Sequence, residues 1–159
     1  MPVETGNRGL FLDLVGTLVR MDETRQLPLD EAGEIVIELM PGVAERLAPI
    51  RDHLIFVVSN QAGIKRGRLR SEAVERAMSE LDERLGGILT GWQFCPHDDG
   101  DGCECRKPRG GMILELAQMY GVDLPGSTMV GDQEIDAAAA RAAGVGHFIF
   151  AKDFFGWPD

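Results

Sequence analysis

Five polar side chains of this sequence are of the types that transfer a phosphoryl group. Asp13, Ser59 and Asp132 each follow an apolar run. Such a reaction needs a nucleophile, a divalent cation and positive groups that offset the charge on the transferred oxygens. A carboxylate can attack phosphorus, and paired carboxylates such as Asp132 and Asp136, four residues apart, suit Mg2+. Together with Lys107, these residues predict a phosphoryl-transfer site.

The predicted site assigns each side chain a task. Asp13 could form an aspartyl-phosphate, and Asp132 could hold Mg2+ jointly with the Asp13 carboxylate. Ser59 and backbone N–H groups around Asn60 could bind phosphate oxygens, while Lys107 could neutralise nucleophile and phosphate together. Each residue also has an ordinary interpretation, because acids cap helix N-termini, polar residues follow strands, and lysines face solvent. Their coincidence at strand ends favours the functional interpretation.

The segment FCPHDDGDGCECRKP predicts a metal site. It contains all 3 cysteines of the chain, Cys95, Cys103 and Cys105, together with His97. Three thiolates and one imidazole complete a tetrahedral zinc site, and with no open position this zinc would be structural. The alternative is a set of free thiols beside an acidic turn. We expect the carboxylates between these residues to be solvated.

Two basic clusters interrupt the acidic sequence, KRGR at 65–68 and RKPR at 106–109. We expect Arg106 and Arg109 to hold a second phosphate or a carboxylate of the substrate. Arg68, in the first cluster, we expect to be a solvated surface charge. A small phosphorylated metabolite such as a sugar phosphate is therefore the predicted substrate.

Apolar runs and helix-period segments alternate along the chain, which predicts an α/β fold with a Rossmann-like parallel sheet and helices on both faces. Ligands of such sheets bind outside the carboxyl ends of the strands, which would bring the predicted site residues to one edge. Ser71 predicts a helix N-cap, and Gly121 and Gly144 predict helix ends. The expected strands are 10–14, 54–58, 88–94, 128–130 and 146–150, and the expected helices are 43–50, 72–85, 112–120 and 134–143.

Length and composition narrow the class of protein. The 159 residues, 44% hydrophobic and 26% charged, predict one globular domain over 1–159. The net charge of -10 argues against nucleic-acid binding, which requires a basic surface. No apolar run is long enough for a membrane span and no signal-peptide pattern is present, so we expect a cytoplasmic protein that binds no membrane. We expect a monomer or a weak homo-oligomer.

The motifs together resemble the haloacid-dehalogenase-like (HAD) superfamily of phosphohydrolases. All four superfamily motifs occur in order, as LDLVGTL around Asp13, VVSNQAGIKRG around Ser59, CRKPRGGM around Lys107 and MVGDQEID around Asp132. The CxH…CxC loop and the adjoining RKP resemble the capless, zinc-loop subgroup that holds the heptose bisphosphate phosphatases and histidinol-phosphate phosphatase domains. The resemblance covers nearly the whole chain.

The resemblance implies a role for each matching position. Asp13 matches the nucleophile and a metal ligand, Ser59 the phosphate-binding hydroxyl, and Lys107 the charge-balancing lysine. Asp132 matches a ligand of Mg2+, and Asp136 a supporting acid near the metal. Substrate binding is implied for Asn60, Arg106 and Lys107.

Val15 departs from the family pattern, which reads Asp-x-Asp at the first motif. The second aspartate normally protonates the leaving alcohol and then activates the water that cleaves the aspartyl-phosphate. General acid–base help is worth about a hundred- to ten-thousandfold in rate, so we expect slow hydrolysis or a restriction to good leaving groups. The Val15 backbone carbonyl could still ligate Mg2+. Asp22 or Glu23, in the loop that follows, is a weak candidate for a substitute acid.

Two functions remain open at this level. The first is a Mg2+-dependent phosphohydrolase, attenuated by Val15, that acts on a small phosphorylated metabolite. The alternative is a non-catalytic HAD-like module that holds a phosphorylated ligand or a partner protein without turnover. Val15 favours the module, while the otherwise intact set of site residues favours the enzyme. No segment leaves room for a cap domain, so we expect an open site with the zinc loop as one wall.

Overall fold

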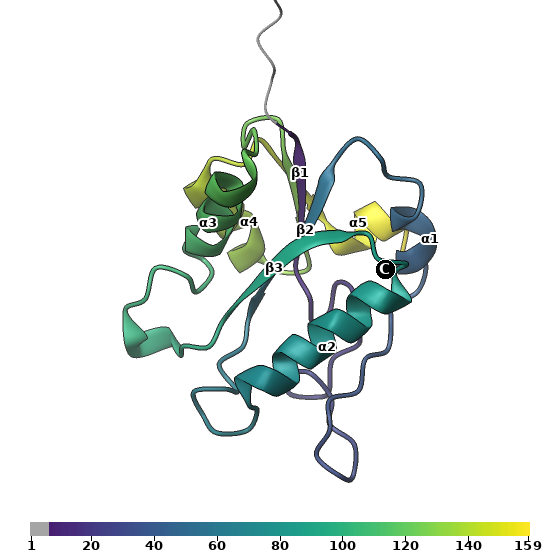
Figure 1. The fold of residues 1–159 in the computed structure, drawn as a ribbon, viewed down its shortest axis with the longest axis vertical. Coiled ribbons are helices and arrows are strands. Elements are labelled where there is room, and N and C mark those ends of the chain that lie inside the picture. The colour runs from purple at the N-terminus through teal and green to yellow at the C-terminus, as the bar shows by residue number, and fades with distance from the viewer. Residues whose placement is uncertain (1–6) are drawn as a thin grey trace, which may run out of the picture.

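The computed structural model describes residues 7–159 and contains one five-stranded sheet (Figure 1). The strand order is β3-β2-β1-β4-β5, and every neighbouring pair is parallel. This order confirms the Rossmann-like parallel sheet expected from the alternating pattern. The strands are β1 (Gly9–Leu12), β2 (Leu54–Asn60), β3 (Leu89–Cys95), β4 (Thr128–Gly131) and β5 (His147–Phe150).

Helices cover both faces of the sheet, as Figure 1 shows with α3 and α4 on one side and α1 and α2 on the other. Odd and even positions of β1 point to opposite faces, so Leu10 and Leu12 join the core under α1 and α2, while Phe11 joins the core under α3 and α4. The helices are α1 (Val43–Leu47), α2 (Ser71–Arg84), α3 (Gly111–Tyr120), α4 (Glu134–Ala143) and α5 (Ala151–Phe155), with a 3-10 turn, η1 (Asp99–Asp101), in the cysteine loop.

The helix ends agree with the sequence in part. Gly121 and Gly144 cap α3 and α4 with φ angles of 65° and 86°, confirming the two glycine stops. The prediction that Ser71 is an N-cap was wrong, because Ser71 is the first residue of α2 and Arg70 precedes it in an extended conformation. No side chain caps that end of the helix. Helix α5 was not expected.

The long connection between β1 and α1 forms no cap domain. Residues 18–40, called the flap here, fold back on themselves through isolated bridges between Val19 and Leu39 and between Leu29 and Ile35. The carboxyl end of the sheet is therefore covered by loops alone in the part of the chain that the structure describes, which confirms the capless architecture.

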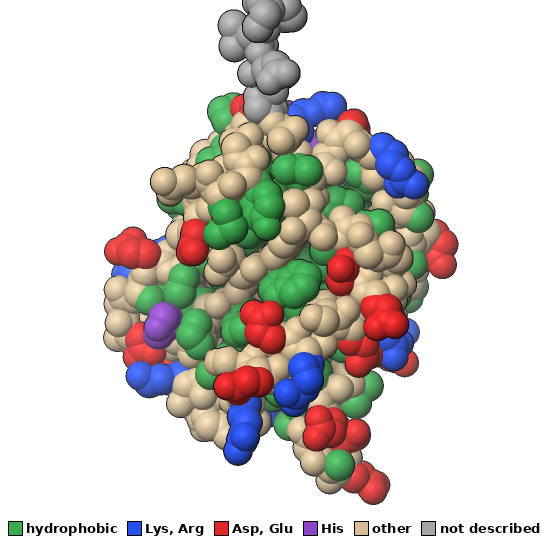
Figure 2. Space-filling view, in the orientation of Figure 1, with side chains coloured by type: hydrophobic (Ala, Val, Ile, Leu, Met, Phe, Trp, Pro, Cys, Tyr) green, Lys and Arg blue, Asp and Glu red, His purple; other side chains and the backbone are tan. Residues whose placement is uncertain are grey.

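The surface mixes both signs of charge despite the net charge of -10. On the face drawn in Figure 2, acidic and basic side chains lie beside one another around hydrophobic areas. Within residues 7–159, no helix has the length and apolarity that crossing a bilayer requires.

Candidate active site

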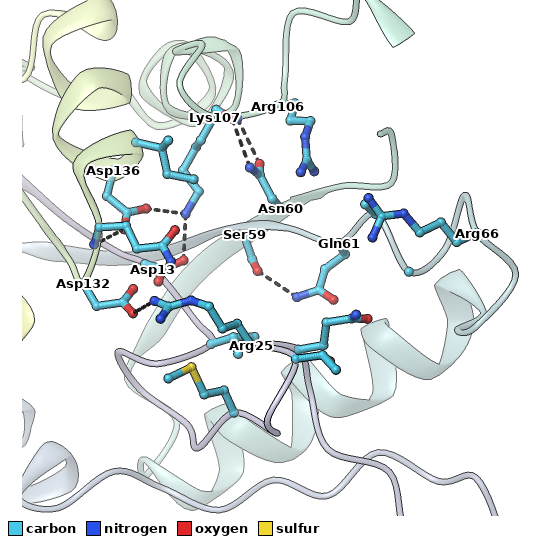
Figure 3. A pocket seen from close by; sticks show the side chains of 18 residues that line it. Asp13, Arg25, Ser59, Asn60, Gln61, Arg66, Arg106, Lys107, Asp132 and Asp136 are labelled. Atoms are coloured by element: carbon cyan, nitrogen blue, oxygen red, sulfur yellow. Dashed lines mark hydrogen bonds and ion pairs between the residues drawn. The ribbon is translucent and has the colours of Figure 1, made fainter. Parts of the chain in front are cut away.

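The predicted site residues converge at the carboxyl edge of the central strands. Asp13 directly follows β1, Ser59 is near the end of β2, and Asp132 directly follows β4. Because β1 lies between β2 and β4, these three positions face one pocket, which Lys107 and Asp136 also line (Figure 3). Asp13 and Asp136, which are 123 positions apart in sequence, thus share one cavity.

The Lys107 ammonium group joins two of the carboxylates. Its Nζ atom lies 2.7 Å from Asp13 Oδ1, 2.7 Å from Asp136 Oδ1 and 3.0 Å from the Val58 carbonyl oxygen. All three N–H donors are therefore used, although the residue is only 4% exposed. Burial alone would lower the pKa of Lys107, but Asp13 and Asp136 outweigh it and raise that pKa, so the ammonium stays charged.

Asn60 fixes the backbone from which Lys107 projects. Its side-chain oxygen accepts from the Lys107 N–H at 2.9 Å, and its side-chain nitrogen donates to the Lys107 carbonyl at 3.1 Å. This paired contact ties the end of β2 to the loop before α3. Asn60 also lines the pocket, as the predicted substrate contact requires, but its polar atoms are already engaged with Lys107.

Three carboxylates form a cluster that one lysine cannot neutralise. Oxygen atoms of Asp13, Asp132 and Asp136 lie within 4.8 Å of one another. Burial, and then the neighbouring Asp13 carboxylate, raise the pKa of Asp132 to about 7. A hard cation with oxygen ligands would relieve this repulsion, so the donor set fits Mg2+.

The backbone closes tightly around this cluster at two glycines. A Cβ added at Gly16, whose φ is 85°, would lie 2.6 Å from Asp132 Oδ2. A Cβ at Gly131 would lie 2.4 Å from the Asp136 carboxyl carbon. Any side chain at either position would displace an acid, which explains why the motifs place glycine there.

Two further polar residues hold the predicted groups in place. The buried Thr17 hydroxyl donates to Asp13 Oδ2 at 3.1 Å. Gln61 Nε2 donates to Ser59 Oγ at 2.8 Å, which leaves the Ser59 hydroxyl proton free to point into the pocket. Sequence reasoning missed both residues. Their positions within the first and second motifs were the available signal.

No carboxylate replaces the missing acid at Val15 among the described residues. Val15 is half-buried and lines the pocket, whose acidic lining residues are Asp13, Asp132 and Asp136. Asp22, a weak candidate substitute, lies outside this lining. Its Oδ1 atom accepts from the Thr24 hydroxyl and from two backbone N–H groups, and the Thr24 hydroxyl in particular lowers its pKa.

Three arginines from different segments line the pocket mouth. Arg66 makes a two-bonded ion pair with Asp98 at 2.7 and 2.8 Å, and Arg106 contacts Asp99 at 2.7 Å. The third, Arg25, comes from the flap and was not foreseen from the sequence.

Two other arginines of the basic clusters lie elsewhere. Arg109, predicted to bind substrate, does not line this pocket and donates to the Cys103 carbonyl of the cysteine loop. Arg68, expected to be solvated, is only partly exposed. It donates to Asp22 at 3.1 Å and to the Leu27 carbonyl at 2.9 Å, so it anchors the flap.

The cysteine loop brings its four predicted ligands together. Donor atoms of Cys95, His97, Cys103 and Cys105 lie within 4.8 Å of one another, as a shared ion with bonds of about 2.0–2.3 Å requires. His97 Nδ1 is 3.3 Å from the sulfur atoms of both Cys95 and Cys105. Burial raises the pKa of the Cys95 thiol, so a cation is needed to hold it as a thiolate. The donor set fits zinc.

The acids of this loop are not simply solvated, contrary to expectation. Asp98 accepts from Arg66, which holds the pKa of its carboxyl down at about 2, and it caps η1 together with Asp101. Asp101 also lies 3.5 Å from Lys65. These ion pairs fasten the cysteine loop to the segment after β2, and their arginines Arg66 and Arg106 line the pocket.

Comparison with known proteins gives a consistent result. A family model described as HAD-hydrolase-like matches residues 104–152. The D-glycero-beta-D-manno-heptose-1,7-bisphosphate 7-phosphatase of Haemophilus ducreyi is 34% identical over 152 residues, covering 88% of this chain and 80% of that protein. The phosphatase of the same name from Pseudomonas aeruginosa is 43% identical over 91 residues, covering 55% of this chain and 51% of that protein.

A solved structure agrees with the sequence comparison. The D,D-heptose 1,7-bisphosphate phosphatase of B. bronchiseptica, complexed with magnesium and phosphate, superimposes with a TM-score of 0.77 at 27% identity, covering 88% of this chain and 78% of that one. Shared sequence over most of the chain and a shared fold exclude a chance match of short motifs. The chain therefore belongs to the haloacid-dehalogenase-like hydrolases, among which it resembles the heptose bisphosphate phosphatases.

Proposed function

We propose that this protein is a Mg2+-dependent phosphohydrolase that uses Asp13 as its nucleophile. The observation that carries the proposal is the Lys107 ammonium group at 2.7 Å from Asp13, inside a cluster of three carboxylates at the sheet edge. The proposed substrate is a small phosphorylated metabolite, either a sugar phosphate or bisphosphate or a histidinol-phosphate-like ester. The names of the heptose bisphosphate relatives favour a sugar bisphosphate.

The chemistry follows from the positions of the side chains. An Asp13 oxygen attacks phosphorus, the ester bond to the leaving oxygen breaks, and an aspartyl-phosphate forms. Lys107 offsets charge on the nucleophile and the phosphoryl oxygens, while the Ser59 hydroxyl donates to one of those oxygens. Asp13, Asp132 and the Val15 carbonyl would hold Mg2+, which supplies further charge neutralisation when bound.

Asp136 supports this arrangement without touching the phosphate. Its second oxygen accepts from the Gln133 backbone N–H at 3.1 Å, at the start of α4, while its first holds Lys107. The carboxylate therefore ties the lysine to a fixed helix end. We assign it a positioning role for Lys107.

Because Val15 replaces the acid of the family pattern, we expect slow turnover. A valine side chain neither donates a proton to the leaving oxygen nor activates water, and the pocket lining offers no other acid at that position within residues 7–159. Turnover should therefore be slow on alkyl phosphates and faster on activated aryl phosphates, whose leaving groups need no proton.

The cysteine loop completes the proposal as a structural element. Zinc held by its four ligands would fix the loop, and the loop in turn holds the pocket residues Arg66 and Arg106 through its acids. We propose that residues 1–159 act as one open domain in which this loop, rather than a cap, contacts the distal part of the substrate.

Phosphate release tests the proposal directly. The native protein should release phosphate slowly from an activated aryl phosphate with Mg2+, and this release should stop with EDTA or with Asp13→Asn. Val15→Asp should raise the rate on alkyl and sugar phosphates by about a hundredfold or more. Release that survives Asp13→Asn would refute the nucleophile.

A non-catalytic phosphate-binding module is the second candidate, and Val15 is the observation in its favour. It predicts that neither the native protein nor Val15→Asp turns over any ester. It also predicts that both bind inorganic phosphate in the presence of Mg2+, as measured by calorimetry.

A further inference from the structure

The flap carries one arginine in an unusual backbone conformation over the pocket. Arg25 has a φ of 65°, and it alone among the described non-glycine residues has a positive φ. Side chains rarely adopt this conformation unless their surroundings impose it. Here the turn is built on Asp22 Oδ1, which accepts from the Thr24 N–H at 2.8 Å and from the Gln26 N–H at 3.0 Å. The Asp22 turn therefore presents Arg25 toward the site.

The Arg25 guanidinium contacts the carboxylate that we assign to the metal. Its Nη2 atom lies 3.2 Å from Asp132 Oδ2, the oxygen that faces the backbone at Gly16. Gln133, turned with its amide oxygen toward the guanidinium, accepts from Arg25 Nε at 2.8 Å. The side chain is 53% exposed, so it can leave this position without opening the core. Figure 3 shows it reaching from the flap to Asp132 below Asp13.

The other two arginines at the mouth pair with acids that the proposed Mg2+ would not occupy. Arg66 uses two nitrogens on Asp98, and Arg106 is held by Asp99 and by the His97 carbonyl. The partners of both belong to the metal loop. Arg25 is the pocket arginine whose partner would be taken over by a divalent cation.

We propose that Arg25 exchanges between Asp132 and the leaving group of the substrate, an inference that rests on the proposed function. When a divalent cation occupies Asp132, the guanidinium is released at the pocket mouth on the Val15–Gly16 side. The nucleophile Asp13 lies at the buried end, so the leaving oxygen of an in-line displacement points toward this mouth.

The proposed step balances without a protein acid. As the bond from Asp13 to phosphorus forms, the ester bond breaks and its electron pair stays on the leaving oxygen. Arg25 donates hydrogen bonds to that oxygen and offsets its charge, but it transfers no proton, because a guanidinium stays protonated. Solvent water then protonates the released alkoxide. Arg25 would thus supply part of the stabilisation that Val15 cannot.

Magnesium titration tests the first half of the exchange. Arg25→Gln removes a cation that competes for Asp132, so its Mg2+ affinity by calorimetry should be about two- to fivefold higher than that of the native protein. Arg20→Gln is the matched control, since Arg20 is a flap arginine of similar exposure, 51%, paired with Glu38 away from the pocket. Equal affinities of the native protein and Arg25→Gln would overturn the proposal.

Leaving-group dependence tests the second half. At saturating Mg2+, Arg25→Gln should lose about tenfold or more on alkyl phosphates and little on an activated aryl phosphate, with Arg25→Lys in between. An equal loss on all esters would show a general structural role and overturn the leaving-group assignment. If the native protein and Val15→Asp are inert on every ester, the proposed function fails and the leaving-group role with it. The Mg2+ titration then still decides whether Arg25 competes for Asp132.

Discussion

Replacing Lys107 with methionine should destabilise the protein far more than an ordinary surface substitution. The Lys107 side chain is 3% exposed, and its carboxylate partners Asp13 and Asp136 are 12% and 2% exposed. Methionine keeps the length of the side chain but removes the ammonium group, which leaves two buried carboxylates without their cation. Removing one partner of a buried ion pair costs about 3–5 kcal/mol in the free energy of unfolding.

The assay is urea unfolding at pH 7.5 without added Mg2+. With a slope of roughly 2 kcal/mol per M, a loss of about 4 kcal/mol lowers the midpoint by about 2 M. Lys152→Met is the matched control, because Lys152 is 52% exposed and pairs with Asp159 at the surface. That substitution should change the free energy by less than about 1 kcal/mol.

The sign of the pH dependence provides a second check. Burial, and then Asp13, already raise the pKa of Asp136 above its usual value, and loss of Lys107 removes the group that opposes this shift. A carboxyl group with a raised folded-state pKa contributes stability at low pH that is lost as the pH rises through that pKa. The deficit of Lys107→Met should therefore shrink between pH 7.5 and pH 5.

Two results would refute this reasoning. If Lys107→Met unfolds at the same urea concentration as the native protein, Lys107 does not lie between the two carboxylates. If its deficit grows as the pH falls, repulsion between buried carboxylates is not its cause. Adding Asp136→Asn to Lys107→Met should recover part of the loss, because it removes one of the unpaired charges.

Three further predictions follow from the site geometry. Burial and the Asp13 carboxylate raise the pKa of Asp132 to about 7, so Mg2+ affinity should rise by up to about tenfold per pH unit below pH 7. The stability of the metal-free protein should fall as the pH rises through 7. Calorimetry and urea unfolding at pH 6 and 8 would show neither trend if Asp132 ionised normally. Cys105→Ser should lower the zinc content below one ion per chain and lower the melting temperature, and an unchanged zinc content by mass spectrometry would contradict the four-ligand site. Gln61→Ala should raise KM about two- to tenfold with little change in kcat, because loss of the Gln61 hydrogen bond frees the Ser59 hydroxyl to rotate. An unchanged KM would show that Gln61 does not orient Ser59.

Much of the fold could be predicted from local patterns. The three central strands, β1, β2 and β4, are largely apolar and buried because both faces of the sheet are covered there. All five predicted strands agree with the observed ones within two residues. Helix α5 was not predicted because its five residues directly follow β5, so no glycine or proline signal separates the two elements. The N-cap prediction for Ser71 failed because a serine before a helical pattern is an N-cap only if its backbone is extended. Here Arg70 has the extended backbone and Ser71 is already helical.

Some features of the site could be predicted from local sequence, and others depend on contacts between distant segments. Residue type and placement after a strand were enough to predict that Asp13, Ser59 and Asp132 meet at one edge of the sheet. The crowding of cysteines was enough to predict that their sulfur atoms converge, because each of these signals spans only a few residues of the chain. The pairing of Arg25 with Asp132, across 107 positions of sequence, carries no local signal. Neither does the engagement of Arg66 and Arg106 by the loop acids.

The amino-acid sequence was therefore sufficient to predict a haloacid-dehalogenase-like phosphatase and to show that Val15 stands where the family pattern has an acid. The tertiary structure was needed to show which of the positively charged side chains can contact a substrate. A side chain's charge is a local property, but its partners are set by the three-dimensional packing of distant segments. That packing commits Lys107 to Asp13 and Asp136, and it leaves Arg25 exposed beside Asp132.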